Sequence, residues 1–208
     1  MTAPDPPARR LGFGSYRGVA LDVAVWDAVG ADVDISFAGM FTRELGRSIS
    51  GGLLHLDAAL GGALLALRAE GVFRGDELET ILLTTPPPPI RGRALMVIGL
   101  GDPEAWRAEL MARATSCALS EAVRLGAKSA SFAPGLLDSG PEPATTPNGA
   151  EAMLRGVVRA IDAQHRLCEA GLVRPPMLRQ WTFGAGASHA DGAVEQFRAA
   201  LESMVGTA

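Results

Sequence analysis

The sequence predicts an α/β fold of three layers, α/β/α, in which helices cover both faces of a mostly parallel mixed sheet. Segments with a strand period alternate with segments of helical period along most of the chain, which is the pattern of a sheet covered by helices. One segment, 94–100, is apolar nearly throughout, as expected for a strand buried on both faces. The length of 208 residues and a hydrophobic content of 48% fit one domain with a sizeable core.

The expected strands are short and evenly distributed. Apolar residues alternate with small or polar ones in 19–26 and 33–37, and segment 40–50 has no regular pattern and is left unassigned. Further strands are expected at 80–85, 94–100, 129–133 and 177–183. Pro86 to Pro89 cannot continue a strand because proline has no N–H, so this run is expected to be a stiff extended connection.

The first expected helix carries apolar residues at helical spacing from Leu56 to Leu67. Asp57 is expected to cap its start, and Gly71 is expected to end it. Gly61 and Gly62 lie inside this helix, where each costs about 1 kcal/mol relative to alanine, so we expect a close approach to a neighbour to offset the cost.

Three more helices are expected. One begins at Pro103 and ends at Gly126, and another has an apolar face from Leu154 to Cys168 and ends at Gly171. The last helix is expected to begin at a capping box formed by Ser188 and Asp191. Residues 1–10, rich in proline and charge, are expected to be a flexible tail, and residues 11–208 a single domain.

Composition and charge exclude several classes of function. A net charge of -4 with no dense basic block disfavours nucleic acid as a partner. No signal peptide opens the chain and its apolar runs are too short to span a bilayer, so we expect a cytoplasmic protein that does not enter a membrane. Cys117 and Cys168 lie in apolar helical patterns and are expected to be buried, reduced thiols.

Little in the sequence indicates catalysis. The three histidines lie in three different segments and no HExxH or CxxC motif is present, so no metal site, cofactor or catalytic residue is expected. His165 lies on an apolar helix face and is expected to be a core histidine. Trp26, Trp106 and Trp181 could stack on a base, but core packing is the simpler interpretation.

Glycine-rich turns between strands and helices are the candidate ligand sites, because their N–H groups can bind phosphate. The turn Gly99–Asp102 is expected to be structural, since Asp102 and Glu104 would repel an anion. Two loops remain candidates for binding, with a plain turn as the simpler alternative for each. Their residues are Ser50, Gly51 and Gly52 in the first, and Gly184, Gly186, Ser188 and His189 in the second.

One ordered series of segments resembles a known family. The series runs Leu-Asp-Ala-Ala-Leu-Gly-Gly-Ala-Leu at 56–64, Glu-Gly-Val-Phe-Arg-Gly at 70–75, Glu-Thr-Ile-Leu-Leu at 79–83 and Ile-Gly-Leu-Gly at 98–101. It is similar to the N-terminal domain of the cytosolic leucyl aminopeptidases, closely from 53 to 101 and loosely elsewhere. The resemblance implies a macro-domain-like fold, oligomer contacts and, by position, a correspondence of Ser50–Gly52 with the glycine loop of macro domains, which often bind ADP-ribose.

The metal-binding segments of those aminopeptidases belong to their C-terminal domain, and no counterpart is found before Ala208. We therefore expect no peptidase activity and a non-catalytic module that binds a small nucleotide-like ligand of the ADP-ribose type or a regulatory partner. Two alternatives stay open. One is a structural or oligomerisation subunit that pairs with itself or with a separate catalytic subunit, and the other is a weak hydrolase of ADP-ribose derivatives.

Overall fold

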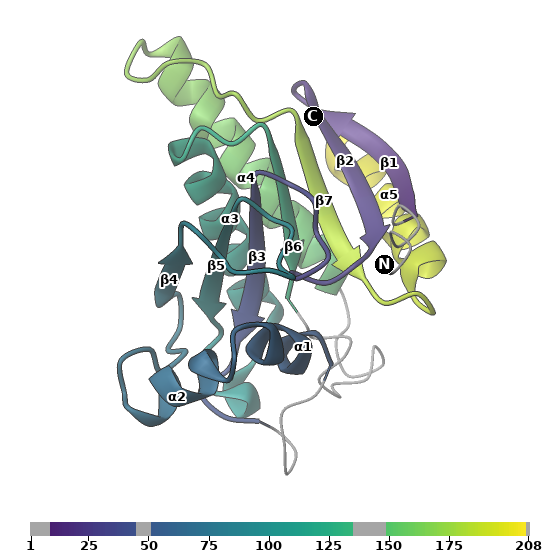
Figure 1. Ribbon diagram of the computed structural model, residues 1–208. Helices are drawn as coiled ribbons and strands as arrows, with labels where there is room; N and C mark the ends of the chain where they lie inside the picture. The colour runs from purple at the N-terminus through teal and green to yellow at the C-terminus, as the bar shows by residue number, and fades with distance from the viewer. Residues whose placement is uncertain (1–8, 45–50, 135–148, 207–208) are drawn as a thin grey trace, which may run out of the picture.

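The computed structural model describes residues 9–44, 51–134 and 149–206 (Figure 1). In these residues the sheet has seven strands in the order β1-β2-β7-β6-β3-β5-β4. The inner five strands are parallel, and β1 and β4 pair antiparallel at the two edges. The strands are β1 (Arg10–Tyr16), β2 (Val19–Val25), β3 (Ile35–Met40), β4 (Thr80–Leu83), β5 (Ala94–Gly99), β6 (Ser129–Ala133) and β7 (Gln180–Ala185).

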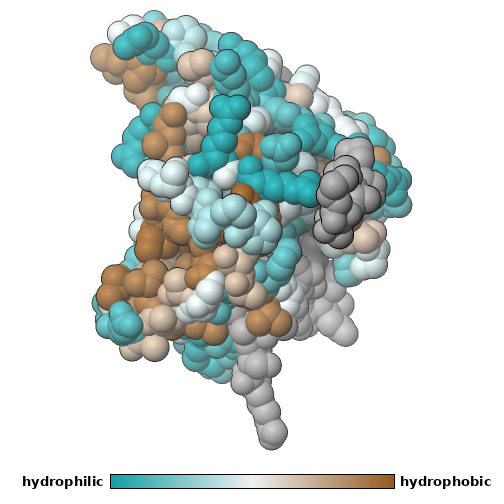
Figure 2. Space-filling model, viewed as in Figure 1, coloured by the Kyte–Doolittle hydropathy of each residue, from teal (hydrophilic) through white to brown (hydrophobic). Residues whose placement is uncertain are grey.

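Helices cover both faces of this sheet, which confirms the three-layer fold predicted from the sequence (Figure 1). One face packs against α3 (Ala108–Arg124), α4 (Gly149–Glu169) and α5 (Ala190–Val205) in the larger apolar cluster. The other face packs against α1 (Gly51–Ala59) and α2 (Ala63–Ala69) in a smaller cluster. The smaller layer leaves part of the sheet near β4 less well covered (Figure 2).

The prediction of one helix from Asp57 to Leu67 is wrong in one respect. The segment forms two helices, and the chain bends by 98° between them. Gly61 and Gly62 have φ of +66° and +84°, and a Cβ on either would meet nothing within 4 Å. They are therefore needed for a left-handed backbone at the bend and not for close packing. Asp57 is buried near the end of α1 and accepts a bond from Leu65 N at 3.1 Å, so it caps α2 instead of starting a helix.

The helix expected from Pro103 is also interrupted. Asp102 caps a short 3-10 turn, η1 (Pro103–Ala105), by accepting from Glu104 N at 3.0 Å. Trp106 and Arg107 are then extended, and α3 begins at Ala108. Trp106 is partly buried against the larger cluster from this extended position, not from a helical face. The helix ends expected at Gly71, Gly126 and Gly171 are confirmed, each with a positive φ.

Strand β1 was not expected from the sequence. Its Phe13 ring stacks on Phe197 of α5, with centroids 5.2 Å apart. A Cβ on Gly14 would lie 2.5 Å from Leu201 Cδ2, so this glycine lets α5 lie close against the strand. The two glycines in Leu-Gly-Phe-Gly interrupt the strand pattern in the sequence, although tertiary packing stabilises the strand.

Within the described residues, no single helix has both the length and the apolar composition needed to cross a membrane. The bent pair α1 and α2 meets that test when the two helices are taken together.

Candidate functional site at the carboxyl edge of the sheet

The five parallel strands end at the same edge of the sheet, and α1 lies beside that edge (Figure 1). The segments that leave it are 26–34, 41–44, 100–107 and 186–189, together with Pro134. In open α/β sheets ligands bind outside the carboxyl ends of the strands, so this edge is the candidate site.

The first predicted loop enters α1. Ser50 lies outside the described residues, whereas Gly51 and Gly52 are the first two residues of α1. Gly51 is exposed and has a φ of +61°. The first turn of α1 contains no acidic residue, so no carboxylate within that turn offsets the partial positive charge of the helix N-terminus.

The second predicted loop follows β7. Gly184 lies within β7, and a Cβ on it would be 2.7 Å from both Ala133 Cβ and Trp26 O, so Gly184 is a packing position. Gly186 accepts a bond from His189 N at 3.0 Å and closes a turn in which Ser188 and His189 are exposed.

The expectation that Ser188 caps the final helix is wrong. The N-cap residue of α5 is His189, which makes no side-chain capping bond, and Ser188 Oγ lies 3.0 Å from His189 Nδ1. Asp191 in the first turn of α5 pairs with Arg9 at 2.9 Å. This helix start is therefore partly neutralised by a carboxylate, unlike the start of α1.

The structure places the start of α1, at Gly51 and Gly52, and the turn from Gly186 to His189 at the carboxyl edge of the sheet. Because β3, β6 and β7 are neighbours in the sheet, the ends of β3 and β7 are separated by two strand spacings, or about 10 Å. That separation suits an elongated ligand that lies across strand ends better than one small ion.

An aspartate–histidine pair, which sequence reasoning did not single out, lies at the same edge. Asp27 follows β2, and its Oδ2 is 2.5 Å from His55 Nδ1 on α1. Its Oδ1 accepts bonds from Val29 N at 3.0 Å and Gly30 N at 2.9 Å. Asp27 comes directly after a predicted strand and His55 comes shortly after a candidate loop; this placement is the signal that could have found them.

This pair orients the imidazole of His55. An ionised carboxylate can only accept, so Nδ1 carries a proton and Nε2 of the neutral ring is an acceptor. The His55 side chain is 58% exposed while that of Asp27 is 23% exposed, so the ring faces solvent and its partner lies behind it. His55 can therefore accept a proton or a hydrogen bond from a molecule at this edge.

Trp26 follows β2 and contacts strand β6. Its Nε1 donates to Ser131 Oγ at 2.9 Å, and the Arg10 guanidinium lies 4.9 Å from its ring centroid. Trp181 is fully buried, as predicted for a core tryptophan, while Trp26 and Trp106 are partly buried.

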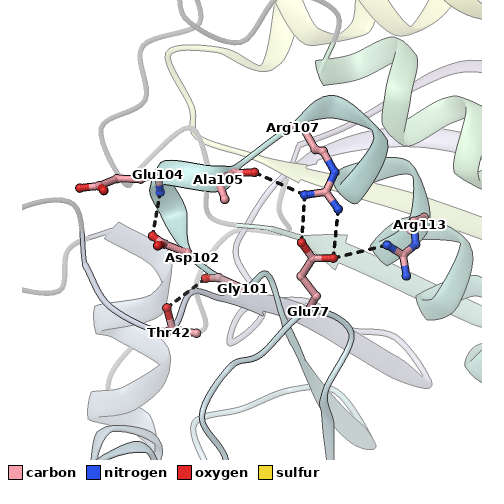
Figure 3. Close-up of polar contacts among 8 residues, drawn as sticks. All are labelled: Thr42, Glu77, Gly101, Asp102, Glu104, Ala105, Arg107 and Arg113. Carbon is pink, nitrogen blue, oxygen red and sulfur yellow. Dashed lines mark hydrogen bonds and ion pairs between the residues drawn. The ribbon is translucent and has the colours of Figure 1, made fainter.

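The turn after β5 differs in charge from the rest of the edge (Figure 3). Glu77 accepts from both terminal nitrogens of Arg107, at 2.9 and 3.1 Å, and from Arg113 at 3.4 Å. Arg43 pairs with Asp102 at 3.1 Å and with Glu104 at 2.9 Å, and the bond to Glu104 is the main cause of its raised pKa. These arginines are already paired with carboxylates, which disfavours anion binding on this side.

The glycines of the same turn are held by the backbone. Gly101 N donates to Gly75 O at 2.8 Å, Leu78 N donates to Gly99 O at 2.9 Å, and a Cβ on Gly99 would lie 2.0 Å from Asp76 O. The close contact leaves no space at Gly99 for a ligand. This geometry agrees with the structural role predicted for the turn.

Other candidate reactive groups lie apart from one another. His165 is 42% exposed and pairs with Glu169 at 3.2 Å on α4, so it is not the core histidine expected. Cys117 and Cys168 are free thiols and only partly buried; burial, and then Glu121, raises the pKa of Cys117. In the described ranges no three His, Cys, Asp or Glu side chains group closely enough to hold a metal ion.

Comparisons with known proteins agree with this architecture. Residues 41–166 match the model of the cytosol aminopeptidase family, N-terminal domain, and no curated protein matches the chain. A mutant of tomato leucine aminopeptidase is 19% identical with a TM-score of 0.64, over 94% of this chain and 38% of the tomato chain. This chain therefore spans well under half the length of that enzyme.

Two macrodomain structures are also similar in fold. The Oceanobacillus iheyensis macrodomain with ADP is 12% identical with a TM-score of 0.66, over 98% of this chain and 100% of the other. The Trypanosoma brucei macrodomain in complex with ADP-ribose is 17% identical with a TM-score of 0.58, over 89% of this chain and 69% of the other. These matches confirm the macro-domain-like fold.

Proposed function

The chain belongs to the cytosol aminopeptidase family through its N-terminal domain, and on that premise we propose that it is a binding module for a small nucleotide-like ligand of the ADP-ribose type. The ligand lies across the carboxyl ends of β3, β6 and β7, between the start of α1 and the turn at Gly186–His189. Binding occurs without peptide hydrolysis, and the family name suggests a cytosolic location.

The observation that carries this proposal is the uneven charge of the carboxyl edge. The first turn of α1 contains no acid, while three acids lie in or beside the turn after β5, near paired arginines: Glu77, Asp102 and Glu104. A diphosphate is favoured at the first and repelled at the second.

Two further observations support a nucleotide-like ligand. His55 Nε2 can accept from a ribose hydroxyl, because Asp27 holds the other ring nitrogen. Macrodomains with ADP and with ADP-ribose have the fold of this chain over most of its length.

Calorimetric titration with ADP-ribose, ADP and AMP tests the proposal. We expect micromolar affinity for ADP-ribose, and a loss of about five- to tenfold in His55→Ala, which removes one hydrogen bond. His165→Ala is the matched control, because His165 also pairs with a carboxylate but lies on α4 away from the edge. No heat with any of the three nucleotides would remove the proposal.

A weak hydrolase of ADP-ribose derivatives is a second candidate, favoured by the Asp27–His55 pair. A histidine oriented by a carboxylate is a suitable general base for water. Chromatographic detection of ADP-ribose released from its esters would test it. Release that is equal in wild type and in His55→Ala would exclude His55 as that base.

A further inference from the structure

The edge strand β4 carries exposed apolar surface on both of its sides. It is the last strand of the sheet, and in the described residues no strand pairs with its outer side. Ile81 and Leu83 are partly buried against the smaller core cluster, and Leu82 on the other face is 37% exposed. Figure 2 shows a broad apolar area over β4 and β5 that continues toward α1 and α2. Leu54 and Val72, on and near those helices, are 47% and 64% exposed.

The opposite edge strand, β1, has protective features that β4 lacks. Strand β1 begins with Arg10 and contains a register shift between Gly12 and Gly14, and α5 packs against it. Charges, bulges and covering elements are the usual means by which an edge strand is kept from pairing with another chain. Strand β4 has the sequence Thr-Ile-Leu-Leu, without charge, glycine or proline, and its register with β5 is regular.

We propose that β4 pairs antiparallel with β4 of a second copy of this chain, across a two-fold axis, so that two sheets join into one. A two-fold axis at Leu82 places this residue opposite Leu82 of the other copy and Ile81 opposite Leu83, so every pair within the strand is uncharged.

The residues that flank β4 fit this pairing. The same axis places Thr80 of one copy opposite Thr84 of the other and Glu79 opposite Thr85, so no like charges meet. The Glu79 carboxylate is already bound by the backbone N–H groups of Arg74, Gly75 and Asp76. Pro86 ends the ladder on the other side, because it has no N–H to donate.

The size of the surface also favours a second copy. Four paired residues bury less than the 1,200 Å² or so that a stable interface needs. The apolar side chains on both sides of β4 supply further area, and a two-fold axis brings this area together from both copies. A single free peptide strand would cover one of these faces only in part.

Sedimentation velocity over a range of concentrations tests the proposal. The wild-type chain is expected to show a monomer–dimer equilibrium, and Leu82→Lys is expected to weaken the dimer by about tenfold or more, because a lysine charge would lie within the pairing. Thr80→Lys places the charge at a second, exposed position of the same strand. Ser15→Lys is the matched control, since it adds the same charge to the exposed side of the other edge strand.

Circular dichroism and thermal melting verify that the three variants fold. The pairing is supported if wild type and Ser15→Lys form dimers and both β4 variants do not. A wild-type chain that stays monomeric up to about 200 μM overturns it, as does a dimer that both β4 variants retain. This result is independent of nucleotide titration, because β4 lies at the edge of the sheet and away from α1's first turn.

Discussion

At the scale of single residues, a row of buried polar side chains crosses the middle of the sheet. The register places four of them side by side on adjacent strands, in the order Asp22, Thr182, Ser131 and Ser36. Gln180 donates to Asp22 at 2.6 Å, and Trp26 donates to Ser131 at 2.9 Å. The hydroxyls of Thr182 and Ser36 have no hydrogen-bond partner among the described residues. The row therefore mixes hydrogen-bonded side chains with hydroxyls that have no partner among the described residues.

Two substitutions in this row should separate these contributions. Thr182→Val replaces a buried hydroxyl without a protein partner, so the free energy of unfolding is expected to stay within about 1 kcal/mol of wild type or to rise. Ser131→Ala leaves the Trp26 N–H unpaired and should cost about 1–3 kcal/mol. Urea denaturation measures both values. A larger loss for Thr182→Val than for Ser131→Ala would contradict this interpretation.

Asp34 should make the stability of the chain depend on pH. Burial tends to raise its pKa, but bonds from the backbone N–H groups of Lys128 and Ser129, at 2.7 and 3.1 Å, and the charge of Arg93 lower it below 3.8. A carboxyl whose pKa is lower in the folded state than in the unfolded state stabilises the fold at pH values above the unfolded-state pKa. This stabilisation is lost as the pH falls through the folded-state pKa.

Asp34→Asn is therefore expected to be less stable than wild type at pH 7, by about 1–3 kcal/mol. The difference should begin to shrink as the pH falls below 3.8, where the unfolded carboxylate binds a proton, and should be lost as the pH falls through the lower pKa of the folded state. Chemical denaturation at pH 7, 4 and 3 measures this trend. A difference that does not vary with pH would show that Asp34 contributes through its shape and not through its charge.

At the scale of elements, the bend between α1 and α2 depends on glycines in a left-handed conformation. Gly62→Ala should cost about 1–2 kcal/mol, because φ is +84° although no atom would obstruct the added Cβ. Gly192 in α5 is a matched control, since its surroundings are equally open and its φ is not in the left-handed range. Gly192→Ala should stabilise the chain by up to about 1 kcal/mol. We expect the melting temperature to fall in Gly62→Ala and to rise in Gly192→Ala, relative to wild type. Equal shifts of the melting temperature in the two variants would contradict this interpretation.

The elements that local patterns predict well are those whose pattern and packing agree. Strand β6 was predicted at its observed bounds and β2 to within one residue, because both have strand-forming residues between clear turns. The breaks at Gly62 and Trp106 were missed because apolar spacing continues through them. What breaks those helices is a capping bond from Asp57 and the extended backbone at Trp106, neither of which follows from periodicity.

At the scale of the whole molecule, the sequence predicts where the site lies better than which groups form it. The alternation of strands and helices and the family resemblance predict the fold and therefore the edge where the strands end. Gly51 begins α1 and Gly186 follows β7, whereas Gly184 belongs to the strand, and the role of these glycines in binding stays a prediction. Asp27 and His55 are 28 residues apart, and only the packing of α1 beside the end of β2 brings them together.

Backbone amide chemical shifts, recorded by two-dimensional NMR during titration with ADP-ribose, test the binding proposal most directly. The account predicts that changes concentrate at Gly51, Gly52, His55 and the turn from Gly186 to His189, and spare the acidic turn after β5. Changes confined to β4 or to α4, or an unchanged spectrum at millimolar ADP-ribose, would contradict it.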